Sequence, residues 1–153
     1  MLAVGLGACQ TLVTTPSLSE RLAPLDRALA SKPAELEAAA ISGDGEAQFG
    51  LSLVWEHGLH GFPVDMNKAA EWRAKALANR RFMPITQYTA GFNGQPSRVN
   101  IINVPTYDVT PAEAMTADAC IAWLSGTTTA DDACGGGPNA ARRRALWTIV
   151  SGP

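Results

Sequence analysis

Apolar residues recur at helical spacing through most of the chain, and prolines and glycines separate these stretches from one another. Side chains spaced three, four and seven residues apart lie on one face of a helix, so the pattern predicts amphipathic helices that pack together. The first helical stretch begins near Ser19, with Pro24 in a break or in a first turn. A second begins at Pro33, because proline suits the first position of a helix.

The clearest pattern spans residues 43–80, where two helical stretches flank a loop that contains glycine and proline. Asp44 and Asp65 are the predicted N-caps, because an aspartate carboxylate accepts hydrogen bonds from the free N–H groups of a first turn. Gly58 can adopt the left-handed conformation that ends a helix. A short loop places consecutive helices antiparallel. The predicted buried faces are Ala47, Leu51, Val54 and Trp55 on the first helix and Ala69, Trp72, Ala76 and Leu77 on the second, while Gln48, Ser52 and Glu56 face away from the buried side of the first.

β-branched and aromatic residues replace the helical pattern between residues 82 and 109. They predict two short strands, 85–89 and 99–104, joined around a glycine-containing turn. An irregular loop packed on the helices is the alternative structure for the same segment.

Two further helices are predicted after this segment. Thr-Pro-Ala-Glu at 110–113 is a capping box with proline at the first helical position, and it predicts a helix that ends near Ser125. Asn139 is the predicted N-cap of a last helix that ends near Val150. The faces expected to be buried are Ala117, Cys120, Ile121 and Leu124 on the first of these helices and Ala141, Ala145, Leu146 and Ile149 on the second.

Composition excludes several classes of protein. The 153 residues are 46% hydrophobic and 17% charged, which is neither a disordered nor a fibrous composition, and a chain of this length is normally one domain. A formal net charge of −2 gives no global field toward DNA or RNA, so no nucleic-acid partner is expected. No run approaches the ~18 apolar residues of a membrane-spanning helix.

Residues 1–8 are apolar or small throughout, and Cys9 follows directly. The sequence Leu-Gly-Ala-Cys at 6–9 resembles the lipobox of bacterial lipoprotein signal peptides. The resemblance implies that Cys9 becomes the lipidated first residue of a mature chain held at a membrane by its acyl chains. Gln10 after the cysteine implies the outer membrane, facing the periplasm. No lysine or arginine precedes the apolar run, and the alternatives are a buried N-terminal segment with an inert cysteine, and a cytoplasmic protein.

Without Cys9, the three cysteines leave the even pair Cys120 and Cys134. In an oxidising periplasm, two cysteines in a small domain are predicted to form a disulfide. Two unrelated buried thiols are the alternative. Neither cysteine has a second cysteine or a histidine at ligand spacing, so no metal site is expected.

Residues 43–80 resemble a SEL-one-like repeat, a relative of the tetratricopeptide repeat. Ser52 stands at the family's glycine position and Trp55 at its tyrosine position, and Arg80 replaces a closing glycine. The arginine implies that a further regular repeat does not follow, whereas residues 35–44 resemble the tail of a preceding, degenerate repeat. The matching positions are Ala47-Gln48, Phe49, Leu51, Gly58, Pro63, Asp65, Lys68-Ala69, Trp72 and Lys75-Ala76.

The resemblance implies a mainly α-helical fold. Small residues at Ala47, Ala69 and Ala76 permit close helix approach, and Trp55 and Trp72 fill the core. One clear and one degenerate repeat cannot bury both faces, so the rest of the chain must cap them. The predicted organisation is a signal segment and tether (1–18), a short array of antiparallel helix pairs (19–80), and a cap made of a β-leaning segment and two helices (81–153).

The sequence contains no catalytic constellation that would identify an enzyme, and no cofactor is expected. His57 and His60, the only histidines, lack the further ligands of a metal site. The run 142–144 is the densest basic segment and is typical of a solvated helix face. The residues considered for contact with a partner are His57, His60, Arg142, Arg143 and Arg144.

These observations favour a non-catalytic scaffold or adaptor of the bacterial cell envelope, which binds a protein or peptide in the groove of its helix pairs. Members of the SEL-one-like family commonly serve as adaptors, and the resemblance implies the same role here. One alternative is an envelope hydrolase that acts on cell-wall material or β-lactams. Another is a structural accessory subunit of a larger complex.

Overall fold

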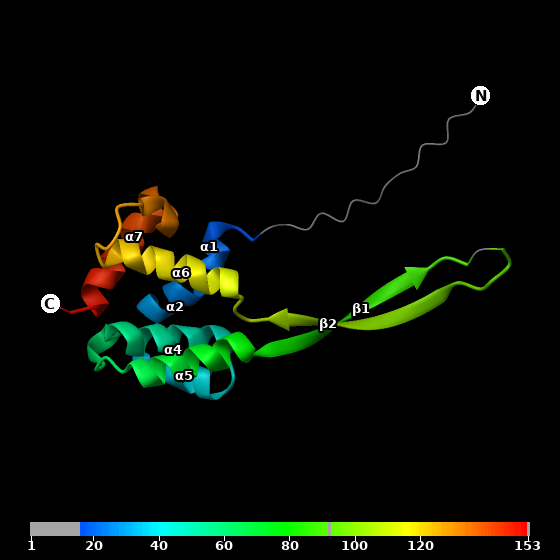
Figure 1. Ribbon diagram of the computed structural model, residues 1–153, viewed down its shortest axis with the longest axis horizontal. Helices are drawn as coiled ribbons and strands as arrows, with labels where there is room; N and C mark the ends of the chain where they lie inside the picture. Colours follow the sequence, from blue (N-terminus) through cyan, green and yellow to red (C-terminus); the bar gives the residue numbers. More distant parts are fainter. Residues whose placement is uncertain (1–15, 92, 153) are drawn as a thin grey trace, which may run out of the picture.

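The computed structural model describes residues 16–91 and 93–152, which form a mainly helical body and one projecting hairpin (Figure 1). Five helices come first: α1 (Leu18–Arg21), α2 (Ala23–Ala30), α3 (Pro33–Ile41), α4 (Gly45–His57) and α5 (Met66–Ala78), with a 3-10 turn at Leu59–Gly61 before α5. The hairpin of β1 (Arg80–Thr89) and β2 (Arg98–Tyr107) follows, and the chain then returns to the body as α6 (Pro111–Leu124), a 3-10 turn (Asp131–Cys134) and α7 (Gly137–Val150).

Local capping sets the ends of α4, α5 and α6 where the sequence places them. The Asp44 carboxylate accepts a hydrogen bond from the Ala47 N–H at 3.0 Å and so caps α4. Asp65 caps α5 in the same way. Gly58 ends α4 in the left-handed region, at a φ of 63°. The capping box of α6 joins Thr110 and Glu113, as predicted.

Helix α4 lies at the centre of the body and contacts α2, α3 and α5. Because neighbours surround it, the prediction that Gln48 and Ser52 face away from the core is wrong. Gln48 is buried and donates to the Ala40 carbonyl at 3.1 Å, and the buried Ser52 hydroxyl donates to the Phe49 carbonyl at 2.6 Å. The Gln48 amide nitrogen and the Ser52 hydroxyl therefore each find a backbone acceptor, whereas the Gln48 Oε1 is buried without a partner among the described residues.

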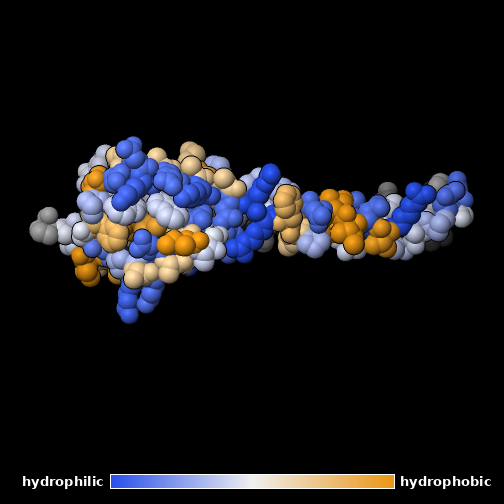
Figure 2. All heavy atoms as spheres, turned by 90° about the horizontal axis from the view of Figure 1, so that it is seen from below, coloured by the Kyte–Doolittle hydropathy of each residue, from blue (hydrophilic) through white to orange (hydrophobic). Residues whose placement is uncertain are grey.

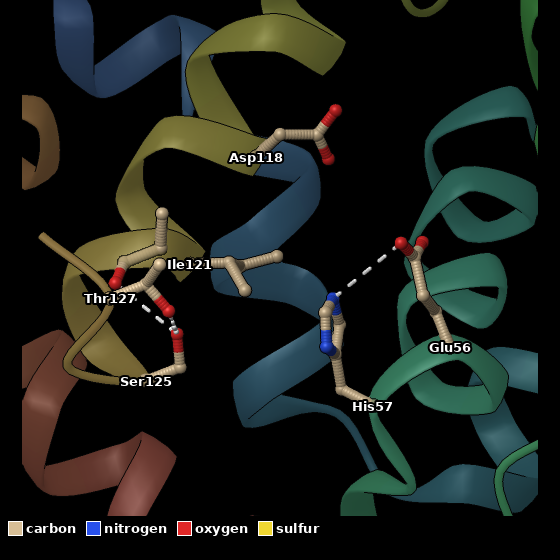
Figure 3. Close-up of a pocket in the computed structure, with 7 residues that line it drawn as sticks. Glu56, His57, Asp118, Ile121, Ser125 and Thr127 are labelled. Atoms are coloured by element: carbon tan, nitrogen blue, oxygen red, sulfur yellow. Dashed lines mark hydrogen bonds and ion pairs between the residues drawn. The ribbon is translucent and has the colours of Figure 1, made fainter.

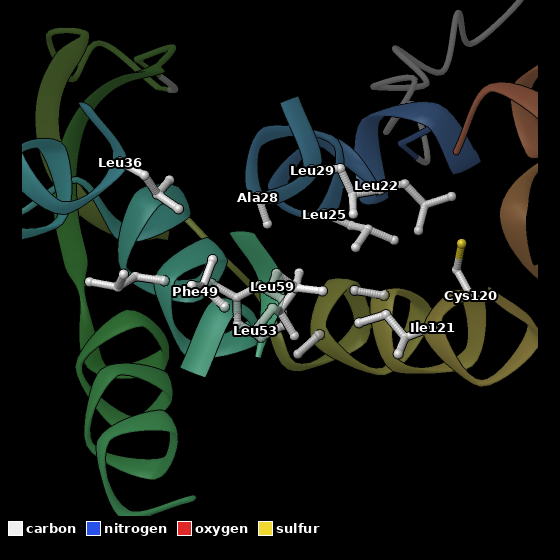
Figure 4. Packing of buried hydrophobic residues seen from close by; sticks show 14 of the residues in the cluster. Leu22, Leu25, Ala28, Leu29, Leu36, Phe49, Leu53, Leu59, Cys120 and Ile121 are labelled. Carbon is white, nitrogen blue, oxygen red and sulfur yellow. The ribbon is translucent and has the colours of Figure 1, made fainter. Parts of the chain in front are cut away.

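The hydrophobic core runs between α2, α4 and α6, as Figure 4 shows for part of the cluster. Phe49 is its largest fully buried side chain. Trp55 and Trp72 are half-buried and pack against the edge of the core, so the expectation that they fill its centre is only partly correct. The small residues Ala47, Ala69 and Ala76 are buried, as predicted.

Helix α7 differs from the prediction in its start and in its buried face. It begins at Gly137, so Asn139 lies inside its first turn instead of capping it. Ile149 is 76% exposed, whereas Arg143 is 3% exposed. The face expected to be buried (Ala141, Ala145, Leu146 and Ile149) is half-buried at Leu146 and otherwise exposed, and the buried residues are Ala140, Arg143 and Val150.

An ion pair explains the orientation of α7. The Arg143 guanidinium donates to both carboxylate oxygens of Asp26 on α2, at 2.7 and 2.6 Å. Its third donor, Nη1, reaches the Cys134 carbonyl at 2.7 Å. A disulfide joins Cys134 to Cys120 on α6, as predicted from the cysteine count. One buried arginine thus connects α2, α7 and the disulfide-linked turn.

The β-rich segment forms a hairpin, and the alternative of an irregular loop is wrong. Its strands pair in an antiparallel register that joins Arg80 to Tyr107 at the base and Thr89 to Arg98 near the tip. β1 begins before its predicted start and ends at Thr89 as predicted, whereas β2 extends beyond its predicted limits at both ends. Every residue of β1 is exposed, and the hairpin points away from the helices instead of covering them (Figure 1). The expectation that this segment caps the helical array is therefore wrong, and α6 and α7 close the body.

Candidate protein-interaction surface

Large apolar side chains cover the hairpin, where little of the chain shields them from solvent. Figure 2 shows them as hydrophobic patches along the extension. Monomeric soluble proteins rarely expose contiguous apolar surface on this scale, and an isolated two-stranded hairpin is marginally stable in water. The exposed fractions run from 44% to 71% over Phe82, Met83, Ile85, Tyr88, Val99, Ile101, Ile102 and Tyr107.

Both faces of the hairpin carry these residues. Directly opposed residues of an antiparallel pair share a face, and successive pairs alternate between faces. One face holds the pairs Phe82–Pro105, Thr86–Ile101 and Tyr88–Val99, and the other holds Met83–Val104 and Ile85–Ile102. A hairpin packed on its own domain needs only one apolar face, whereas this hairpin has apolar residues on both.

The hairpin is also basic. Residues 80–107 contain three arginines and no aspartate or glutamate, whereas the whole chain has a net charge of −2. The remainder of the chain therefore carries −2 − 3 = −5. At the base, Arg81 pairs with Asp108 at 3.1 Å and Arg80 lies 5.6 Å above the Phe82 ring. Arg98 lies at the far end of β2, and complementary charge on a partner would be acidic.

A tight joint fixes the hairpin to the body. The Asp108 carboxylate accepts from the Gly45 N–H at the start of α4, at 3.1 Å, and from the Arg81 guanidinium. A Cβ on Gly45 would lie 2.6 Å from the Asp108 Cβ, so only glycine permits this approach. Next to this joint, burial raises the pKa of the Glu46 carboxyl group. The Arg27 Nη1 atom lies 2.8 Å from a carboxylate oxygen of Asp44. The joint holds the extension in a defined direction.

A second candidate is a shallow cavity of about 230 Å³ on the body, between α4 and α6. Its acidic residues, Glu56 and Asp118, are both bound by Arg73, at 3.2 and 2.7 Å. The hydrogen bond to Asp118 is the main cause of the raised pKa of Arg73, which keeps the guanidinium protonated. Both carboxylates of the cavity are therefore engaged in ion pairs with Arg73.

The same cavity contains a histidine and a serine that do not act together. Burial lowers the pKa of His57, which favours the neutral imidazole, and its Nε2 lies 4.0 Å from Glu56. The Ser125 hydroxyl interacts with the Ala122 carbonyl and with the Thr127 hydroxyl. Figure 3 shows Ile121 projecting between the serine and the histidine. Among the described residues no hydrogen bond joins Ser125 to His57, so the cavity does not assemble an activated nucleophile.

The sequence-predicted contact residues are spread over the body. His60 lies 2.8 Å from the Ala28 carbonyl and ties the loop after α4 to α2. Arg142 and Arg144 are exposed on α7, and Arg144 lies 3.8 Å above the Trp123 ring. Arg143 is buried in its ion pair with Asp26, so the prediction that it contacts a partner is wrong. These residues do not form one patch with the hairpin.

Other predicted features concern metals and membranes. Cys9, the predicted lipidation site, lies outside the residues that the structure describes. Within residues 16–91 and 93–152, histidine, cysteine and acidic side chains do not gather in any group of three that could hold a metal ion. In the same residues, none of the helices has the length and the apolar character needed to cross a membrane.

The sequence did contain a signal for the exposed hairpin. In the strand sequence Arg-Arg-Phe-Met-Pro-Ile-Thr-Gln-Tyr-Thr (80–89), apolar residues occupy both odd and even positions and acidic residues are missing. Such a strand has no polar face for solvent.

Comparison with known protein families, with curated proteins and with solved structures finds no match to this chain.

Proposed function

We propose that the chain is a non-catalytic scaffold or adaptor of the bacterial cell envelope, which binds a protein partner through its β1–β2 hairpin. The observation that carries the proposal is the exposure of large apolar side chains on both faces of a hairpin that the body does not cover. A partner that covers these faces removes them from water, which is favourable by ~25 cal/mol per Å² of apolar surface.

A protein fits this surface better than the interior of a membrane does. Each strand of a two-stranded hairpin has a free edge of backbone N–H and C=O groups. Hydrocarbon offers these groups no hydrogen-bonding partner, so open sheet edges do not occur there. A folded protein supplies both apolar contacts and polar groups for the edges and for Arg98.

The place in the envelope rests on two features of the sequence and structure. The lipobox-like residues 6–9 favour a lipid anchor at Cys9 and an outer-membrane protein that faces the periplasm. The Cys120–Cys134 disulfide suits an oxidising compartment. In the proposed role, the lipid anchor holds the chain at the membrane and the hairpin reaches outward to its partner.

The helical body serves as the support in this proposal. The pair α4–α5 is interpreted as one SEL-one-like repeat unit, preceded by a degenerate unit in α2–α3. Two residues that end or begin these helices, Gly58 and Asp65, stand at positions of the family's pattern. The engaged carboxylates of the α4–α6 cavity favour this support role over the hydrolase alternative.

Excision of the hairpin is expected to abolish binding of the partner while the body stays folded. Replacing residues 82–105 with Asn-Gly joins Arg81 to Thr106, which are directly opposed in the native register, through a turn that suits two antiparallel strands. Complexes released from membranes by mild detergent would be compared by native electrophoresis. The intact chain should migrate in an assembly with a second protein species, and the excised chain should not.

The control for the excision removes exposed apolar surface from the helical body and leaves the hairpin unchanged. Ile149→Ser removes a side chain that is 76% exposed on α7, and it should leave the assembly unchanged. Thermal melting of the excised chain confirms that the body is intact. An excised chain that melts normally and still migrates in the assembly would contradict binding through the hairpin.

A further inference from the structure

We infer that two copies of the chain associate by pairing their β2 strands edge to edge, which produces a four-stranded antiparallel sheet with a two-fold axis at Ile101. This dimer goes beyond the proposed scaffold function and does not depend on it. It uses the free edge of β2, whereas the observation that carries the scaffold proposal is the exposure of the apolar faces of the hairpin.

The two prolines in the strands of the hairpin show which backbone groups point outward. Opposed residues in an antiparallel ladder alternate between hydrogen-bonded pairs and pairs whose N–H and C=O groups point away from the partner strand. Proline has no N–H, so a strand accepts it where that group points outward. Pro84 lies opposite Asn103 and Pro105 lies opposite Phe82, two positions along the ladder. Both prolines therefore belong to the outward class of pair.

Because the two classes of pair alternate, every second residue along each strand has its N–H and C=O groups pointing outward. The rows of outward groups differ between the β1 edge and the β2 edge. On β1 the proline at position 84 interrupts the row in its middle, between Phe82 and Thr86. On β2 the proline at position 105 lies near the base, and Asn103, Ile101 and Val99 form an uninterrupted row beyond it. Proline on an edge strand is a common device against edge-to-edge pairing. This device protects the middle of β1 and leaves β2 open.

A second copy fits this edge because the β2 segment is complementary to itself. In an antiparallel pairing centred on Ile101, Val99 lies opposite Asn103 of the other copy, and these outward groups make on the order of six inter-strand hydrogen bonds. The segment 99–105 contains no charged residue, so no like charges oppose one another there. Arg98 lies opposite Val104 in this register.

The shape of the chain permits this pairing. The helical body lies at the base of the hairpin. Each strand has 10 residues and so extends about 33 Å from the base. Because the body lies at one end of the hairpin (Figure 1), an antiparallel arrangement places the two bodies at opposite ends of the four-stranded sheet. An isolated two-stranded hairpin is only marginally stable in water. The four-stranded sheet places the apolar faces of two hairpins side by side, and it is more stable than either hairpin alone. Its two faces remain available for another protein.

Sedimentation equilibrium of the purified full chain tests the inference. All variants carry Cys9→Ser, so that a thiol-linked dimer cannot form. The parent chain should be a reversible dimer, and Ile101→Pro should raise its dissociation constant at least about tenfold, because it removes an outward N–H at the centre of the interface. Thr86→Pro is the matched control: Thr86 lies directly opposite Ile101 within the hairpin, but on the β1 edge. It should leave the dissociation constant unchanged.

A second measurement remains informative if a proline variant unfolds the hairpin. Opposed residues in a hydrogen-bonded antiparallel pair have Cα atoms about 5.5 Å apart, within the range of a disulfide. Ile101→Cys should therefore oxidise to a covalent dimer, and Thr86→Cys should not. A parent chain that is monomeric at about 100 μM, or equal effects of the two variants in either pair, would overturn the dimer. A monomeric chain whose excision variant still loses its partner would leave the scaffold function standing.

Discussion

Arg143→Ala should lower the free energy of unfolding by about 3 kcal/mol, because it leaves the Asp26 carboxylate without its charged partner. The pair is bidentate, and the two side chains are 4% and 25% exposed. Removing one partner of a buried ion pair costs ~3–5 kcal/mol, and the residual exposure of Asp26 places this case at the lower end. The variant also loses the hydrogen bond to the Cys134 carbonyl.

Urea denaturation followed by circular dichroism measures the change, and the neighbouring residue supplies a control. Arg142→Ala removes an exposed arginine and should change stability by less than ~0.5 kcal/mol. The double variant Arg143→Met with Asp26→Leu should recover most of the loss, since an apolar pair of similar volume leaves no buried charge behind. Equal effects of Arg142→Ala and Arg143→Ala would contradict the assignment of Arg143 to the core.

Loss of the disulfide is the second large effect expected. The bridge joins Cys120 and Cys134 across a sequence separation of 14. In the chain-entropy account, closing a loop of this length stabilises a protein by ~3 kcal/mol. Replacing both cysteines by serine should therefore lower the free energy of unfolding by roughly that amount. Both sulfurs are buried, so the variant also places two hydroxyls in an apolar site, which adds to the loss.

Reduction separates the effect of the bridge from that of the serines. Treating the native chain with reductant should lower its denaturation midpoint, whereas the double serine variant should not respond. A native chain whose midpoint is the same in oxidising and reducing buffer would show that the bridge contributes nothing to stability.

Features set by local contacts could be predicted from the sequence. Asp44, Asp65 and the 110–113 capping box begin helices where expected, because a cap depends on residues at most three positions away. The hairpin and the pairing of Cys120 with Cys134 were also predictable in kind. The longer strands were not, since their ends depend on pairing across the ladder.

Features set by distant partners could not be predicted. Asp26 lies 117 positions before Arg143, so the arginine resembled part of a solvated basic run. It lies on the buried stripe of α7 with Ala140 and Val150, and apolar spacing alone does not distinguish this stripe from the neighbouring face. Helix α4 presents the same problem, because only its three neighbours explain why Gln48 is buried.

The candidate site was harder to predict than the fold. The sequence analysis predicted partner contacts at basic and histidine residues on the helices, because charged groups are the usual signs of binding. The hairpin has few charges, and its apolar residues fitted a buried cap equally well. Only the direction in which it leaves the body shows that Tyr88 and Ile101 lie in solvent.

Photo-crosslinking in cells tests the central claim, that the exposed hairpin is the binding surface of a scaffold. Benzoylphenylalanine would replace Tyr88, which is 67% exposed on the hairpin, or Met115, which is 72% exposed on α6. The account predicts a discrete adduct between the chain and a different protein from position 88 and none from position 115. An adduct with a different protein from position 115 alone, or adducts from position 88 that contain only the chain itself, would contradict it.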